Sequence, residues 1–336
     1  MVTLYVTSLE KGNGKTAVCA GLGKRLLAEG KKVGYFKPVI TSGKKTPAAG
    51  ADSDAEFLKK LFALSESVEL LCPALSDGSK LASNIKEAYA KVSQGKDVVI
   101  VEGPSEQYQA SPDTVKALNA KVIGVETYSK GLLKTTDSYK DFGQSLLGIV
   151  LNKVPQSRIE QTRSEVSAGL NKAGVNILGV LPEDRALLAM TMGELAERIQ
   201  GEILRGAEQS AELVENLMIG ALVVDPGPDY FGRKASKAAI IRSDRPDMQM
   251  AAMETSTTCL VLTGDTQLKP VVLERAEEKN VPIIVARGDT STTVKSIEDA
   301  LVETRFNQEN KLPKLMEIME QNLDFQAIYK GLGLAS

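Results

Sequence analysis

The run Gly12-Asn13-Gly14-Lys15-Thr16 has the residue types of a loop that binds the phosphates of a nucleotide. Glycines let backbone N–H groups turn inward onto phosphate oxygens, a lysine binds the β- and γ-phosphates, and a hydroxyl binds Mg²⁺. The full pattern also requires glycine at position 9, where this chain has Leu9. The run therefore predicts a nucleotide site, and the alternative is a glycine-rich turn that caps a surface helix.

Two acidic residues are candidate metal ligands. Glu102 ends the apolar run 98–102, at the edge where open parallel sheets bind ligands, and its carboxylate can complete Mg²⁺ coordination with Thr16. The alternative is a carboxylate that caps the next turn. Asp54 is the second candidate, although an Asp before a helix is also an ordinary N-cap.

Lys37 and Asn152 each follow an apolar run as well. Lys37 precedes Pro38, which stops helix formation and fixes the chain near the same sheet edge. A surface lysine is the alternative. Asn152 carries an amide donor and an amide acceptor, the groups that can read an adenine, but Asn also commonly ends strands for turn reasons.

The elements that must position these residues are short Val- and Ile-rich runs separated by stretches with helical spacing. Runs that are continuously apolar fit a parallel sheet covered on both faces. We predict strands at 2–7, 33–39, 98–102, 122–127, 147–152, 177–181, 238–241, 259–263 and 282–286. We predict helices at 16–29, 54–64, 80–94, 114–119, 159–172, 187–199, 202–217 and 312–326, with others after Lys269 and Thr290.

This order predicts an α/β chain: a P-loop NTPase-like doubly wound parallel sheet followed by a second, smaller α/β domain. We expect the nucleotide-binding domain at residues 1–205, the second domain at 213–306 and a helical extension at 307–336. The polar segment 202–217 is expected to be a linking helix. The extension is amphipathic and is expected to pack on either domain or on a second copy.

Composition excludes several classes of function. The chain has no histidine, so His-dependent triads and His metal sites are excluded. Cys19, Cys72 and Cys259 lack metal-site spacing and are expected to be buried thiols. A net charge of -2 without a basic run predicts no nucleic-acid partner, and no apolar stretch approaches a bilayer span. We expect a cytoplasmic protein that forms a homo-oligomer.

Six segments in order resemble the dethiobiotin-synthetase-like P-loop domain, as in the N-terminal region of long bacterial phosphotransacetylases. A second set resembles the DRTGG domain that follows in those proteins. We expect the acyltransferase domain, which would need several hundred further residues, to be absent. The first set is Thr7-Ser8 with Gly14-Lys15-Thr16, Gly34 to Val39, Ser53-Asp54-Ala55, Val101-Glu102-Gly103, Gly148 to Asn152 and Leu178 to Asp184; the second is Met218 to Ala221, Ser243 to Asp247, Leu262 to Asp265 and Val281 to Val285.

The resemblance implies ATP and Mg²⁺ as cofactors. It places Lys15 and Lys37 at the phosphates and substrate, Asn152 at the adenine, and Thr16, Asp54 and Glu102 at the metal. In the second domain, Ser243 to Arg245 and Thr263 to Thr266 could surround a small-molecule effector, or serve only as caps and turns.

The segment after Glu102-Gly103 departs from dethiobiotin synthetases. It reads Pro104-Ser105-Glu106, where those enzymes have a glycine-rich continuation facing the substrate. A proline removes an N–H donor and restricts the turn. We therefore predict an ATP/Mg²⁺-binding regulatory protein, with slow ATPase activity as an option. The alternatives are an ATP-dependent ligase that activates a carboxylate or carbamate, and an interaction scaffold with a degenerate loop.

Overall fold

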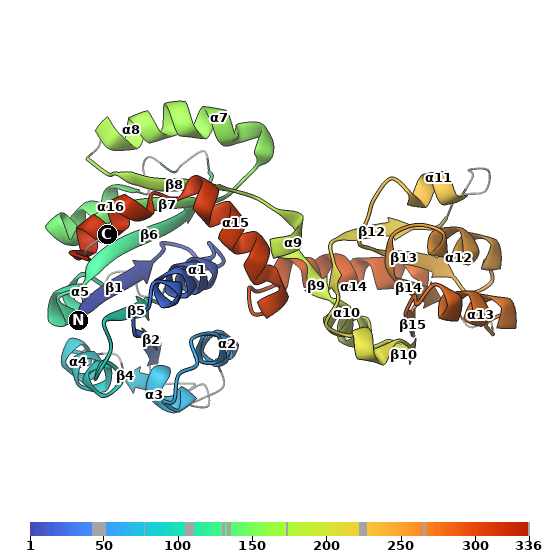
Figure 1. Cartoon of the computed structure of the whole chain (residues 1–336), viewed down its shortest axis with the longest axis horizontal. Helices are drawn as coiled ribbons and strands as arrows, with labels where there is room; N and C mark the ends of the chain where they lie inside the picture. Colours follow the sequence, from blue (N-terminus) through green and yellow to red (C-terminus); the bar gives the residue numbers. More distant parts are fainter. Residues whose placement is uncertain are drawn as a thin grey trace. The chain divides into compact units, whose positions relative to one another are not determined.

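The computed structural model describes residues 1–41, 52–76, 78–104, 111–129, 132, 136–172, 174–221, 227–264 and 267–334. The chain forms two compact units (Figure 1). Unit 1 contains Met1–Glu183 and Phe306–Ser336, and unit 2 contains Asp184–Arg305. Among the described residues, no helix is both long enough and apolar enough to span a bilayer.

Unit 1 is built on a six-stranded sheet in the order β2-β5-β1-β6-β7-β8, and every pairing in it is parallel. The loop-bearing strand β1 lies in the middle, between β5 and β6. Its carboxyl end therefore opens at the edge where the strands of a doubly wound sheet bind ligands, as predicted. The strands are β1 Val2–Thr7, β2 Val33–Phe36, β5 Val98–Glu102, β6 Lys121–Thr127, β7 Leu146–Val154 and β8 Ile177–Pro182, with a separate pair β3 Val39–Thr41 and β4 Ala74–Ser76.

Helices cover this sheet and include the two that carry candidate site residues, α1 and α2. Glycines in α1 allow close packing, because a Cβ on Gly23 would lie 2.1 Å from the ring of Phe62. The helices are α1 Lys15–Ala28, α2 Ser53–Leu61, α3 Val68–Leu71, α4 Leu81–Val92, α5 Ser111–Leu118, α7 Ile159–Gln161, α8 Ser167–Lys172, α15 Leu312–Asn322 and α16 Phe325–Leu332. The 3₁₀ segments are η2 Thr136–Ser145, η3 Gln156–Arg158 and η6 Glu309–Lys311, and η4 Thr162–Val166 is π-helical.

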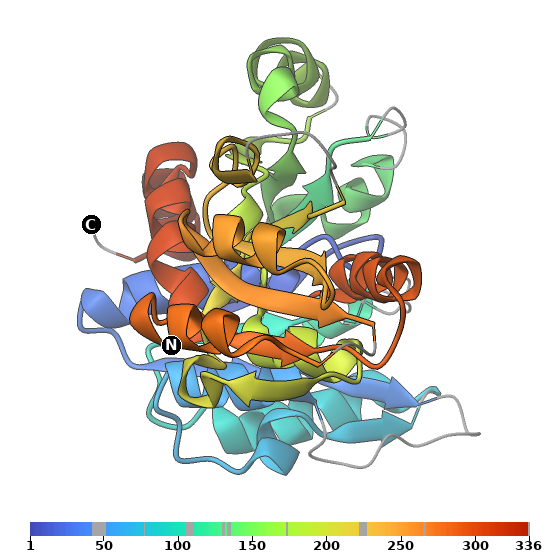
Figure 2. The same ribbon diagram turned by 90° about the vertical axis from the view of Figure 1, so that its right-hand side faces the viewer.

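Unit 2 has a five-stranded sheet in the order β10-β15-β14-β13-β12, in which only the β10–β15 pairing is antiparallel. One face packs on α10 and α14 and the other on α11, α12 and α13, which makes this unit a second α/β layer structure (Figure 2). Its elements are α9 Arg185–Leu188, β9 Met190–Thr191, α10 Met192–Arg198, β10 Glu202–Arg205, η5 Ala207–Gln209, β11 Leu213–Val214, β12 Asn216–Ile219, α11 Gly227–Phe231, β13 Lys237–Arg242, α12 Pro246–Met253, β14 Thr257–Thr263, α13 Pro270–Glu278, β15 Ile283–Val285 and α14 Thr290–Glu303.

The last segment of the chain, Phe306 to Leu334, returns to unit 1, and we call it the return segment. In Figure 1 its helix α15 lies beside α1, and a Cβ on Gly21 of α1 would lie 2.1 Å from Met319 Sδ. Asp324 N donates to the Leu178 carbonyl of β8, at 2.7 Å. Because this segment follows unit 2 in sequence, unit 2 is an insertion in unit 1.

The predicted linking helix at 202–217 is wrong. The segment instead contains the strands β10, β11 and the start of β12. Ile203 packs against the apolar core of unit 2, and β10 pairs with β15, so tertiary pairing outweighs the local helical preference. The bounds of the two units differ from the predicted domain ranges. Residues 184–205, predicted in the first domain, lie in unit 2, and residues 307–336, predicted as a separate extension, lie in unit 1.

Candidate phosphate and magnesium site

The phosphate loop depends on two glycines with left-handed backbone angles. Gly12 has φ 78° and Gly14 has φ 92°, values that other residues adopt at a cost. At Gly14 a Cβ would also lie 2.2 Å from the Asn152 side-chain nitrogen. Gly14 is the N-cap of α1 and brings no side chain to accept the first N–H groups of that helix. The start of α1 is thus suited to an anion.

Lys15 and Thr16 begin α1 and direct their side chains to two different partners. The Lys15 ammonium donates to the Ser8 hydroxyl at 2.9 Å, across the loop. Burial lowers the pKa of Lys15. Thr16 donates from its hydroxyl to Glu102 Oε1 at 2.9 Å. The two strand ends β1 and β5 are paired neighbours, so their register places Glu102 beside the loop.

Glu102 is a buried carboxylate, with 3% of its surface exposed. Besides Thr16 it accepts a hydrogen bond from the Tyr35 hydroxyl at 2.8 Å. Burial raises the pKa of Glu102, although Lys37 and Lys15 act in the opposite direction. A buried carboxylate with two hydroxyl donors is fixed in position, which is what a ligand of a small cation requires.

Lys37 lies among three carboxylates. Its ammonium is 2.9 Å from Asp52, 2.7 Å from Asp54 and 4.0 Å from Glu102. Burial opposes the charge on Lys37, but Glu102 and Asp54 outweigh it and hold the pKa of this lysine above its usual range. The N-cap of α2 is Asp52, which accepts from Ala55 N. The N-cap alternative for Asp54 is therefore wrong, and this carboxylate faces Lys37.

The donor set fits Mg²⁺. Thr16 offers a hydroxyl, and Asp54 and Glu102 offer carboxylates, the hard oxygen ligands that this ion prefers. Within the described ranges no three acidic or thiol side chains form a metal cluster by themselves.

Glu126, which the sequence analysis missed, anchors the loop from the end of β6. Its carboxylate is buried and accepts from Leu9 N at 2.8 Å, from the Asn13 amide at 2.7 Å and from the Tyr139 hydroxyl at 2.5 Å. Burial raises its pKa, while Tyr139 and the Leu9 N–H act against this. An acidic residue near the end of an apolar run was the available signal, the same one that singled out Glu102.

Asn152 and Lys153, at the end of β7, contact the loop backbone. The Asn152 amide donates to the Asn13 carbonyl at 2.9 Å, and the Lys153 ammonium donates to the Gly12 carbonyl at 2.8 Å. The structure therefore brings all the predicted nucleotide residues of unit 1 to one sheet edge. It gives Asn152 a partner in the loop itself, so one of its amide hydrogens is already bonded.

The second predicted group lies at the carboxyl ends of β13 and β14. Thr263 and Thr290 share a hydroxyl hydrogen bond of 2.7 Å, and Ser243 N donates to the Thr263 carbonyl. Arg242 pairs with Asp244, and Arg245 pairs with Asp247. Asp265 and Thr266, like Ser105 and Glu106 of unit 1, lie outside the described residues.

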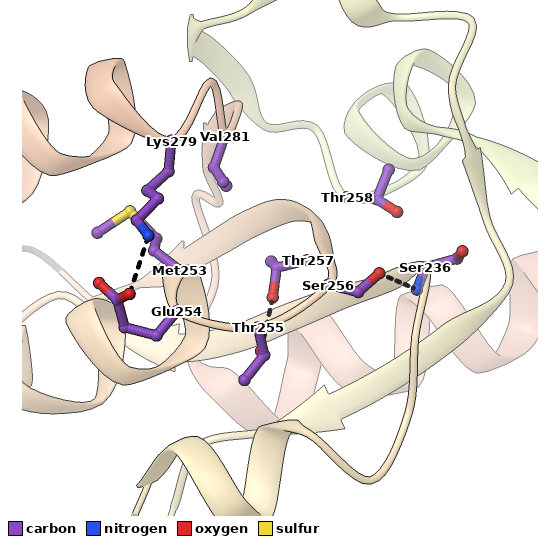
Figure 3. Close-up of a pocket in the computed structure, with 9 residues that line it drawn as sticks. All are labelled: Ser236, Met253, Glu254, Thr255, Ser256, Thr257, Thr258, Lys279 and Val281. Atoms are coloured by element: carbon purple, nitrogen blue, oxygen red, sulfur yellow. Dashed lines mark hydrogen bonds and ion pairs between the residues drawn. The ribbon is translucent and has the colours of Figure 1, made fainter.

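A cavity of about 420 Å³ lies at the opposite, amino-terminal edge of the unit 2 sheet (Figure 3). Thr255 and Thr257 both donate to the Ala252 carbonyl, at 2.8 and 2.7 Å, so their hydroxyl hydrogens are already used. Glu254 pairs with Lys279 at 2.9 Å. This cavity offers mostly acceptors and a neutralised ion pair. Its lining is Ser236, Met253, Glu254, Thr255, Ser256, Thr257, Thr258, Lys279 and Val281.

Comparison with known proteins supports the two-part organisation. The AAA domain family matches residues 2–191, and the DRTGG domain family matches residues 194–300. Phosphate acetyltransferase of Nitratidesulfovibrio vulgaris is 22% identical over 360 aligned positions, which cover 96% of this chain and 50% of that protein. This chain thus spans about half the length of the phosphate acetyltransferases that it matches.

Two further similarities cover about half of this chain each. ATP-dependent dethiobiotin synthetase BioD of Caldicellulosiruptor saccharolyticus is 27% identical over 179 residues, covering 45% of this chain and 74% of that enzyme. Among solved structures, the MinC:MinD cell division protein complex of Aquifex aeolicus matches with a TM-score of 0.38 and 16% identity, over 56% of this chain and 84% of that chain. This chain belongs to the AAA domain family in its dethiobiotin-synthetase-like P-loop form, with a DRTGG domain as its second part.

Proposed function

We propose that this protein binds ATP with Mg²⁺ at the phosphate loop of unit 1 and acts as a regulatory module. The observation that carries the proposal is the convergence of Lys15, Thr16, Glu102 and Lys37 on one sheet edge, next to the glycine-rich start of α1. Lysines and helix N–H groups bind phosphates, and the hydroxyl and carboxylate bind a hard cation.

Each residue has a role that follows from its position. Lys15 would leave Ser8 and bind the β- and γ-phosphates. Thr16, Glu102 and Asp54 would hold Mg²⁺, which supplies charge neutralisation of the phosphates when bound. Lys37 would exchange its carboxylate partners for the terminal phosphate. Asn152 would hold the loop through its bond to the Asn13 carbonyl, while its side-chain oxygen and second amide hydrogen would face the adenine.

A regulatory role is supported by Pro104, which follows the metal-binding strand and removes an N–H donor where dethiobiotin synthetases bind substrate. The DRTGG domain and the relatives named phosphate acetyltransferase point the same way. An ATP-dependent ligase is the second candidate, because Lys37 and the similarity to dethiobiotin synthetase favour it. A regulatory protein would respond to the bound nucleotide, whereas a ligase would consume ATP to activate a carboxylate or carbamate substrate.

The return segment offers the route by which nucleotide and unit 2 would influence each other. Its first residue, Phe306, packs edge-on against Phe57 of α2, and Glu309 pairs with Lys60 at 2.9 Å. Its helix α15 packs on α1. Both helices that bear site residues thus contact the chain immediately after unit 2 ends. A ligand shifts such an equilibrium only if it binds the two arrangements with different affinity.

Hydrogen exchange on the full chain tests this proposal, with and without ATP and Mg²⁺. We expect increased protection at the loop, at 306–322 and around Asp244 to Asp247, because coupling of about 1–3 kcal/mol slows exchange several-fold. Protection confined to the loop, with unchanged exchange in the return segment and unit 2, would show an ATP site without regulation. A matched sample with ATP and EDTA separates the effect of the metal from that of the nucleotide.

A further inference from the structure

Glu126 is a buried anion placed beside a loop that is built for anions. Only 5% of its surface is exposed, and its two oxygens accept from two groups of the loop, Leu9 N and the Asn13 amide. A carboxylate in that place repels phosphates, so it is not a phosphate ligand. Its contacts give it another role, because both loop donors are bonded to this one side chain of β6.

The loop carbonyls are held from the same side. Lys153 binds the Gly12 carbonyl and Asn152 binds the Asn13 carbonyl, at 2.8 and 2.9 Å. These two bonds restrict the conformation of the backbone around Gly12 to Gly14. These bonds, with the two to Glu126, hold the loop in one shape, which is what a preorganised phosphate site requires.

Leu9 is one of the two loop residues that Glu126 holds. The standard loop has glycine at this position, and this chain has a residue with a side chain there. The Leu9 N–H is bonded to the carboxylate, so this residue contributes to loop shape and not to phosphate binding.

We propose that Glu126 is the positioning residue of the phosphate loop: it fixes Leu9 and Asn13 so that the loop is preorganised for phosphate. This inference rests on the proposed nucleotide site. Glu126 does not touch the nucleotide, and it acts through the two loop residues.

The test is a double-mutant cycle read by ATP titration calorimetry and by ¹H–¹⁵N spectra of the loop amides. Glu126→Gln keeps the shape but brings an amide donor against Leu9 N–H or the Asn13 amide, so ATP should bind at least ten-fold more weakly. Adding Asn13→Asp restores the pairing of an amide with a carboxylate, because residue 126 then supplies the amide and residue 13 the carboxylate. The double variant should regain most of the lost affinity.

Tyr89→Phe is the matched control, because it removes another buried tyrosine hydrogen bond of unit 1, to Thr3 at 2.7 Å, away from the loop. It should leave ATP affinity and the Gly12 and Gly14 amide signals unchanged, while Glu126→Gln shifts those signals in the nucleotide-free protein. Wild-type ATP affinity in Glu126→Gln, or no recovery in the double variant, would overturn the assignment. Unshifted loop signals in Glu126→Gln would also overturn the assignment, because these spectra need no bound ATP. If the wild-type chain bound no ATP, that result would refute the proposed function and leave the spectra as the test of Glu126.

Discussion

Replacing Lys37 by Met should destabilise the nucleotide-free protein and make its stability depend on Mg²⁺. The substitution removes the ammonium that lies 2.7 Å from Asp54 and 2.9 Å from Asp52, leaving them and Glu102 without this positive charge. The side chains of Lys37 and Asp54 are only 18% and 12% exposed. Breaking a fully buried pair costs roughly 3–5 kcal/mol, so we expect a loss of about 2 kcal/mol for this partly buried one.

The stability of Lys37→Met should depend on Mg²⁺ because of mass action. A divalent ion that replaces the ammonium binds only the folded protein, and at about 100 times its Kd it contributes roughly 2.7 kcal/mol. We therefore expect millimolar Mg²⁺ to recover most of the loss in Lys37→Met. In the wild type the ammonium competes with the ion, so the same addition should change stability much less.

The assay is urea unfolding followed by circular dichroism, with and without Mg²⁺. Lys96→Met is the matched control, because it removes an ion pair of similar exposure, to Glu66 at 2.8 Å, and Lys96 pairs with no second carboxylate among the described residues. This control should lose stability and gain nothing from Mg²⁺. If Lys37→Met is equally insensitive to Mg²⁺, then the lysine does not lie in a cation site, and the metal assignment fails.

Three more predictions follow from individual residues. Glu102→Gln should weaken the binding of Mg²⁺-ATP more than that of metal-free ATP, and equal weakening in calorimetry would give Glu102 a structural role. Gly14→Ala should lose ATP binding, because its Cβ would lie 2.2 Å from the Asn152 amide nitrogen at φ 92°, and normal affinity in a titration would contradict the loop geometry. Burial lowers the pKa of Lys237 from 10.5 to about 8. Between those pH values the unfolded chain binds more protons, so stability should rise with pH by up to roughly 3 kcal/mol, and Lys237→Met should abolish the rise in pH-dependent denaturation.

The sheet of unit 1 was predictable because its strands are continuously apolar. The predicted bounds of β1 and β5 agree with the structure, and the three cysteines are buried thiols as expected. The loop residues could be recognised because their chemistry needs glycine, lysine and a hydroxyl in a fixed order. A resemblance spread over six segments then identified Lys37 and Glu102, which lie far apart in the sequence.

What could not be predicted depends on tertiary pairing. Residues 202–205 have ordinary helical composition, and only their pairing with β15 makes them a strand. The amphipathic return segment shows an apolar face but not its partner, which is α1 through Gly21 and Met319. Either Asp52 or Asp54 could cap α2 as far as the local sequence shows, and only the structure identifies Asp52 as the N-cap. Glu126 was passed over because its partners, Leu9 and Asn13, are more than a hundred residues away.

The central claim is that the phosphate loop binds ATP, and calorimetric titration of three forms of the 336-residue chain tests it most directly. The wild type should bind one ATP per chain in Mg²⁺. Lys15→Ala should bind at least about thirty-fold more weakly, because it removes a charge-assisted contact worth roughly 2 kcal/mol. Lys24→Ala, which changes an exposed lysine about two and a half turns further along α1, should bind like the wild type. Equal ATP affinity in Lys15→Ala and the wild type, or no binding by the wild type, would contradict the account.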